Sequence, residues 1–80
     1  MDRKDVKRIL RTSCRGVLND LLEDVGFSDI EKTIFYNRYV LSNPRSVPVI
    51  CLMAHCSPST YNDIHNRILD KVLSHFLHKK

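Results

Sequence analysis

The side chains best suited to chemistry lie between Cys51 and Arg67. Cys51 and His55 stand four residues apart and Cys56 follows, so these groups could bind zinc with His65 as a fourth ligand. A buried free cysteine behaves instead as a small apolar residue, and we expect no metal site and no cofactor. The sequence holds no paired carboxylates, glycine-rich loop or serine–histidine–aspartate order, so we expect no enzyme activity.

The polar residues after Cys56 suit the recognition of DNA. Asn62 can bind adenine N6 and N7 together, and Asp63 can accept a hydrogen bond from cytosine N4. Thr60 and Arg67 suit phosphate contacts, which set register rather than specificity. Arg67 could instead pair with Asp63, and the whole set could be a merely solvated face. The expected DNA-binding residues are Ser57, Ser59, Thr60, Asn62, Asp63, Asn66 and Arg67.

Tyr61, His65 and Ser57 each have an expected place in the fold. We expect Tyr61 in the core with its hydroxyl exposed, and His65 exposed to solvent. Ser57 is expected to cap the helix that follows it, and the amides beside it suit a backbone phosphate.

Positive charge is concentrated near the N-terminus of this chain, whose net charge is +4. The opening turns of the expected first helix hold Arg3, Lys4, Lys7, Arg8 and Arg11. The helix dipole favours acids there, so an anionic partner such as phosphate would explain the cluster, and a solvated face that serves solubility would explain it as well. We expect these bases and the Lys79–Lys80 tail to add sequence-independent attraction to DNA.

Composition and length limit the possible classes. The chain has 80 residues, of which 42% are hydrophobic and 28% charged, as in an ordinary globular domain. Its longest apolar run, residues 47–54, is shorter than the roughly 20 residues that span a bilayer, and we expect no signal peptide and no membrane partner. Three cysteines form no even disulfide framework, so we expect a reducing, cytoplasmic location.

The spacing of apolar residues predicts a single all-α domain of four helices. The first is expected over residues 2–24, because apolar residues recur every three or four positions from Val6 to Leu22. Gly26 suits a left-handed cap after it. Ser28 and Glu31 form a capping box that begins the second helix, which ends near Val40.

The third and fourth helices are expected on either side of a tight turn at residues 55–56. Ser46 caps the third helix, and Ser57 with Pro58 begins the fourth, which continues to about Phe76. Residues 28–76 would form a helix-turn-helix core covered by the first helix through Leu18, Leu21 and Leu22. The expected core residues of the later helices are Ile34, Phe35, Tyr39, Ile50, Ala54, Tyr61, Ile64 and Ile68.

Three stretches share the pattern of a known family. They hold a capped helix with an arginine–aromatic pair, a second capped helix with a small residue, and a third with a regular apolar face. The matching residues are Ser28, Glu31, Ile34, Phe35, Arg38 and Tyr39, then Ser46, Ile50 and Cys51, then Ser57, Tyr61, Ile64, Ile68, Leu69, Lys71 and Val72. Residues 27–72 thus resemble the promoter-recognition domain, region 4, of bacterial sigma factors.

Other families share part of this pattern. LuxR-type DNA-binding domains have equivalents of Ser57, Thr60, Lys71 and the Ile68–Leu69 pair, and small phage or mobile-element regulators look similar. In sigma factors the base-reading positions correspond to residues 58, 59, 62 and 63. Pro58 cannot reach a base edge, so we expect a target other than the usual promoter element.

The resemblance implies a transcription regulator, bacterial or from a phage or mobile element, whose fourth helix enters the major groove of double-stranded DNA. A module this small makes few base contacts, so we expect it to dimerise or to work beside RNA polymerase. The alternative is a protein-interaction module that binds polymerase, a sigma domain or a second copy of itself. That module would use the apolar stripe of the first helix or the charge-balanced fourth helix.

Overall fold

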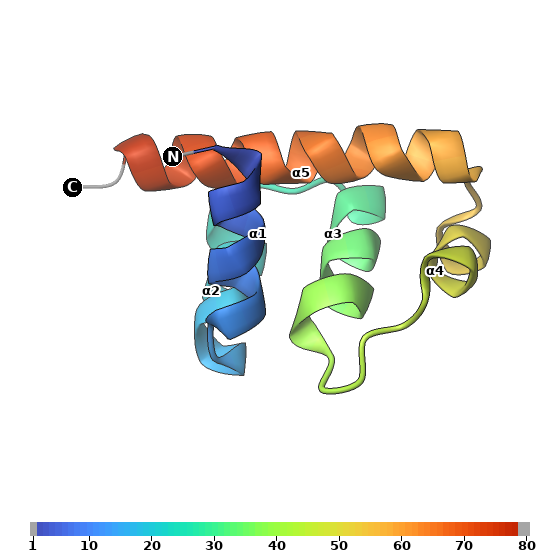
Figure 1. Cartoon of the computed structure of the whole chain (residues 1–80), viewed down its shortest axis with the longest axis horizontal. Helices are drawn as coiled ribbons and strands as arrows, with labels where there is room; N and C mark the ends of the chain where they lie inside the picture. Colours follow the sequence, from blue (N-terminus) through green and yellow to red (C-terminus); the bar gives the residue numbers. More distant parts are fainter. Residues whose placement is uncertain (1, 79–80) are drawn as a thin grey trace.

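The computed structural model describes residues 2–78 and shows an all-helical fold (Figure 1). Its elements are α1 (Arg3–Thr12), α2 (Arg15–Asp24), α3 (Asp29–Phe35), a π-helical segment η1 (Tyr36–Val40), α4 (Val47–Ala54) and α5 (Pro58–His78). The all-α class is confirmed, whereas the prediction of four helices is wrong because the first of them is divided in two.

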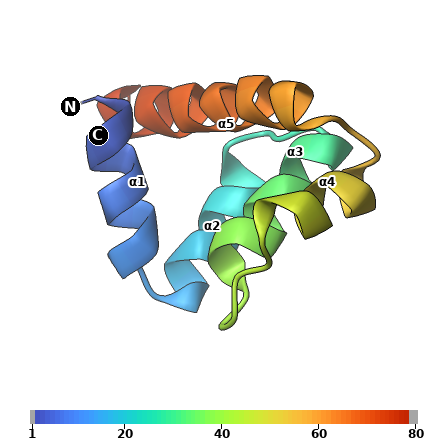
Figure 2. The same ribbon diagram turned by 45° about the vertical axis from the view of Figure 1, so that its right-hand side comes forward.

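Helix α5 is the longest element, and three other helices pack against one side of it. Its 21 residues extend about 31 Å, close to the 37 Å longest dimension of the molecule. Helices α1, α3 and α4 each contact α5, and no helix covers its opposite side in either view (Figures 1 and 2). The outward side of α5 is therefore open along its length.

The helix is interrupted between α1 and α2 at Ser13 and Cys14, where a continuous helix is expected from the sequence. The Ser13 hydroxyl donates to the carbonyl oxygen of Ile9 at 2.6 Å, and the Thr12 hydroxyl donates to that of Arg8 at 3.0 Å. Such side-chain bonds to the backbone compete with helix continuation. The break resets the helical phase, so that Cys14 and Val17, expected on the buried stripe, are exposed.

Helix α3 begins at the expected cap and runs directly into η1. The Ser28 amide donates to the carboxylate of Glu31 at 2.8 Å and the Glu31 amide donates to the Ser28 hydroxyl, which completes the capping box. The wider π-helical turn of η1 ends at Val40, as expected for the second helix. Gly26, between α2 and α3, has the predicted left-handed conformation with φ +80°.

Helices α4 and α5 are joined by a sharp three-residue turn. His55 ends α4 in the left-handed conformation with φ 56°, which few residues other than glycine adopt readily. Ser46 occupies the cap position of α4 as expected, but its side chain makes no capping hydrogen bond. The bend predicted at residues 55–56 is confirmed.

The core forms where α1, α3 and α4 meet the inner side of α5, and α2 extends it by packing against η1. The expected residues of the later helices are buried, with Tyr39 and Ala54 only partly so, and Leu18 and Leu21 of α2 join them with Leu22 at the edge. Val6 and Leu10 of α1 are also fully buried. Within the part of the chain that the structure describes, no helix combines the length and apolar character needed to cross a membrane.

Candidate nucleic-acid interface

The exposed side of α5 carries most of the predicted DNA-binding residues. Ser59, Thr60, Asn62, Asp63 and Arg67 are exposed, and Asn66 is half-buried. Over residues 2–78 the ion pairs are Arg3–Asp70 and Lys71–Glu31, so Arg67 does not pair with Asp63. The polar side chains of this helix are thus accessible, as a surface that contacts DNA requires.

The N-terminus of α5 is capped as the sequence predicts. The Ser57 hydroxyl accepts a hydrogen bond from the Thr60 amide at 3.2 Å and donates to the Thr60 hydroxyl oxygen at 3.0 Å. Such a cap is worth about 1 kcal/mol. Both hydroxyls are therefore engaged with each other, and a phosphate contact at Thr60 would use the hydroxyl proton of that residue.

His65 is buried, which corrects the expectation that it is exposed. Its imidazole stacks against the rings of Tyr39 and Tyr61, and its Nε2 lies 2.6 Å from the Tyr39 hydroxyl. Burial lowers the pKa of His65 to about 4, with a further contribution from the cations of Lys7 and Arg38. His65 is therefore a neutral core residue that holds Tyr39.

Tyr61 lies in the core as expected, but its hydroxyl is not exposed. The hydroxyl oxygen is buried and has no hydrogen-bond partner among the described residues. Burial raises the pKa of Tyr61. The residue therefore contributes packing and the stack on His65 rather than a contact to bases.

A ridge of positive charge follows the exposed side of α1. Lys4, Lys7, Arg8 and Arg11, together with Thr12, line a shallow hollow of about 330 Å³ that no acid lines. We call these four bases the α1 ridge. Arg3, expected to act with them, instead makes a two-pronged hydrogen bond to the carboxylate of Asp70 on α5 at 2.8 Å. That bond accounts for a base in the first turn of α1 and anchors the start of α1 to α5.

Helix α1 begins at α5, where Arg3 bonds to Asp70, and runs away from it across its axis (Figures 1 and 2). Lys7 and Arg38 are near enough to His65 to lower its pKa, and Asn62 precedes His65 by three residues, so the two are neighbours on the helix surface. Lys7 of the ridge and Arg38 of η1 are thus the bases that act on the turn of α5 that follows Asn62. Thr60 and Arg67 lie farther round the helix than Asn62, whereas Asp63, two turns before Asp70, lies on the same side of α5 as the carboxylate that binds Arg3.

Arg38 and Tyr39 are functional candidates that the sequence reasoning used only as family and core markers. Both line a second pocket, next to the ridge, that shares Arg11 with it. The arginine–aromatic pair was visible in the sequence, but its proximity to α1 depends on the break after Thr12. The expected contribution of Lys79 and Lys80 lies outside the described residues.

Cysteine and histidine positions near the turn do not gather. Among residues 2–78 no group of three or more histidine, cysteine or acidic side chains is arranged to hold a metal ion. Cys51 is buried in the core, as expected for a small apolar residue, Cys56 is half-buried, and both are free thiols.

Comparison of the chain with protein-family models, curated proteins and solved structures finds no match.

Proposed function

We propose that the chain is a sequence-specific DNA-binding transcription regulator of the sigma-like helix-turn-helix kind, from a bacterium, phage or mobile element. Helix α5 enters the major groove with its outward side, and the α1 ridge adds sequence-independent attraction to the DNA phosphates. The observation that carries the proposal is that four bases of α1 are in no ion pair among residues 2–78, while the side of α5 that exposes Asn62 is uncovered.

Charge and geometry support different parts of this proposal. Contacts from lysine and arginine to phosphate supply most of the sequence-independent affinity, which is the role of the ridge. An asparagine in the major groove discriminates adenine by about 1–3 kcal/mol, which is the role of Asn62. We also propose that the fold resembles sigma region 4, or alternatively LuxR-type domains, and that the protein works beside RNA polymerase.

The experiment selects bound fragments from a random duplex library and then measures affinity for the enriched site. We expect Asn62→Ala to weaken binding to that site by about tenfold while binding to unrelated duplexes stays the same. A variant with Lys7, Arg8 and Arg11 all replaced by Gln should weaken binding to every duplex. Lys32→Gln, an exposed base on α3 that lines neither hollow, is the control. Wild-type protein that enriches no site and binds no duplex would refute the proposal.

A second candidate function, self-association, rests on the surface of α4. This helix carries no charged residue, and it exposes Val49 at 39%, Leu52 at 77% and Met53 at 44%. Two copies of this cationic chain can meet there without opposing like charges, and an isologous contact would pair the same patch on both. The apolar stripe of α1, the surface first considered for a partner, is buried in the core.

Sedimentation equilibrium tests this second candidate. The wild-type chain should reach a monomer–dimer equilibrium at micromolar concentration, and Leu52→Glu should stay monomeric at the same concentration with an unchanged circular dichroism spectrum. Glu in place of exposed Val17 on α2 is the matched control. A wild-type chain that is monomeric at all concentrations would exclude self-association through α4.

A further inference from the structure

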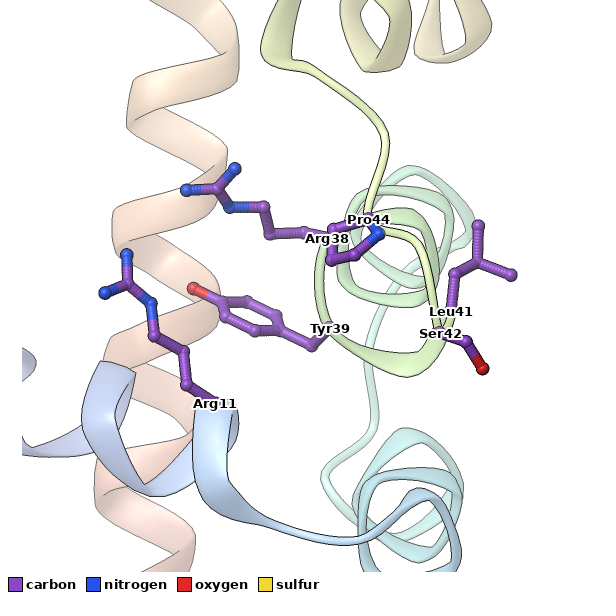
Figure 3. A pocket seen from close by; sticks show the side chains of 6 residues that line it. All are labelled: Arg11, Arg38, Tyr39, Leu41, Ser42 and Pro44. Carbon is purple, nitrogen blue, oxygen red and sulfur yellow. The ribbon is translucent and has the colours of Figure 1, made fainter.

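A pocket of about 390 Å³ lies between the end of α1, the π-helical segment and the loop that follows it. It is lined by Arg11, Arg38, Tyr39, Leu41, Ser42 and Pro44. Arg11 and Arg38 come from different elements, yet their side chains extend to the same side, and the Tyr39 hydroxyl lies between them in the view of Figure 3. Leu41 and Ser42 point away from this group and form the outer edge.

The positive charge of this pocket is not balanced within the part of the chain that the structure describes. No acid lines the pocket, and neither Arg11 nor Arg38 takes part in an ion pair among residues 2–78. Both guanidinium groups are close enough to Tyr39 to lower its pKa against the larger effect of burial, which raises it to about 12. Two cations that converge on one hydroxyl repel each other, and an anion between them would remove that cost.

The hydroxyl of Tyr39 is held in place for a second hydrogen bond. His65 Nε2 lies 2.6 Å from it, and a neutral imidazole can either donate or accept at that nitrogen. When Nε2 carries the proton, it donates to the Tyr39 oxygen, and the phenolic proton is free to point into the pocket. The buried His65 therefore lets Tyr39 act as a donor toward an anion.

We propose that Arg11, Arg38 and the Tyr39 hydroxyl form a phosphate-binding site. Two planar guanidinium groups and one hydroxyl offer donors from three directions, which suits the several oxygens of a tetrahedral phosphate better than the two of a carboxylate. The phosphate is either a backbone phosphate of DNA or that of a free small molecule. Only the first of these rests on the proposed function.

The test titrates the ¹⁵N-labelled full chain with inorganic phosphate, with sodium chloride adjusted to keep the ionic strength constant. Saturable shifts of the His65 and Arg38 side-chain resonances should appear. Arg38→Gln should weaken phosphate binding by about tenfold, since charge-assisted bonds to phosphate are the strong ones, and Lys32→Gln should not change it. Tyr39→Phe should weaken it less and abolish the shift at His65.

Two results would overturn the site. One is the absence of any saturable shift in the wild-type chain, and the other is an Arg38→Gln variant that binds phosphate as tightly as wild type. Folding of each variant is checked by its amide spectrum, and Arg38, on the pocket surface, leaves the core residues in place.

A DNA arm separates the two sources of phosphate. If a duplex displaces inorganic phosphate from the site, the natural ligand is a backbone phosphate. If the duplex and inorganic phosphate bind together, the site serves a free phosphorylated molecule. Phosphate binding in a chain that binds no duplex would support the site and refute the proposed DNA-binding function, so the two failures are distinguishable.

Discussion

The stack of Tyr39, His65 and Tyr61 links the core to the basic surface at the scale of single residues. His65 is 9% exposed and lies against two tyrosine rings, and its bond to Tyr39 fixes the hydroxyl nearest to Arg11 and Arg38. A histidine in this position is expensive to protonate, because the imidazolium would be buried next to cations. The free energy of unfolding should therefore depend on pH through His65.

Acidification should destabilise the fold through His65. Its pKa is about 4 in the folded chain and about 6.5 when unfolded, so between these values only the unfolded state binds the proton. The free energy of unfolding should consequently fall by about 2 kcal/mol between pH 7 and pH 5. Urea unfolding at the two pH values measures this, and His65→Gln should remove most of the difference. An equal pH dependence in wild type and variant would contradict the buried, neutral His65.

The two ion pairs of the described chain differ in burial and should differ in worth. Glu31 is fully buried and receives the Lys71 ammonium at 2.6 Å, whereas both partners of Arg3–Asp70 are half-exposed. Burial raises the pKa of Glu31, but the Lys71 ammonium and the Ser28 amide and hydroxyl more than offset this, so that the pKa lies below its usual value. The carboxylate therefore stabilises the fold above its unfolded pKa, and this contribution is lost as the pH falls through the folded value.

Lys71→Met removes the charge of this pair and keeps most of the apolar stem. We expect the free energy of unfolding at pH 7 to fall by about 1 kcal/mol, since Lys71 is partly exposed and the solvent screens the pair. The loss of stability between pH 5 and pH 3 should also become smaller, because Glu31 no longer has a lowered pKa. Asp70→Asn, which breaks the exposed pair, should change stability much less when both are measured by urea titration.

At the scale of elements, two glycines should respond oppositely to the same substitution. Gly16 is the second residue of α2 and Gly26 has φ +80°, and an added Cβ would meet no heavy atom within 4 Å at either position. Gly16→Ala should stabilise the fold by about 0.5–1 kcal/mol through helix propensity. Gly26→Ala should destabilise it by about 1 kcal/mol through backbone strain. Thermal unfolding that moves in the same direction for both variants would contradict the α2 boundaries.

The sequence predicts these elements well where a side chain or a glycine marks their ends. The capping box of Ser28 and Glu31, the left-handed Gly26 and the Ser57 cap all lie where their residue types indicate. The break after Thr12 is missed because the apolar spacing continues from Leu10 to Leu18 without proline or glycine at the break itself. The hydroxyls of Thr12 and Ser13 are the only local signal, and their effect depends on tertiary packing.

The candidate site is predictable in part for the same reason. The polar side of α5 follows from helix periodicity, so Asn62 and its neighbours are exposed as expected. The burial of His65 is not predictable from the sequence, because a histidine fits either side of an amphipathic helix. Which side it takes depends on Tyr39, which comes from a distant segment. The convergence of Arg11 and Arg38 requires the fold of α1 against α5, which no local pattern encodes.

At the scale of the whole molecule, α1, α3 and α4 pack against one side of α5 and leave its opposite side uncovered (Figure 2). The α1 ridge and Arg38 lie on its inner side, and Arg67 is exposed on the helix itself without an ion pair among residues 2–78. Arg3 is bonded to Asp70, Lys71 to Glu31, and Arg45 to the side chain of Asn37. The bases near α5 that remain for an anionic partner are those of the α1 ridge, Arg38 and Arg67.

The salt dependence of DNA affinity tests the central claim, that the α1 ridge and α5 contact one duplex together. The measurement is the slope of the logarithm of the association constant against that of the salt concentration, by fluorescence anisotropy. We predict a slope of about −4 for wild type, at about 0.9 per phosphate neutralised, reduced by about 2 to 3 when Lys7, Arg8 and Arg11 are all Gln. A wild-type slope near zero, or a slope that this variant leaves unchanged, would contradict the account.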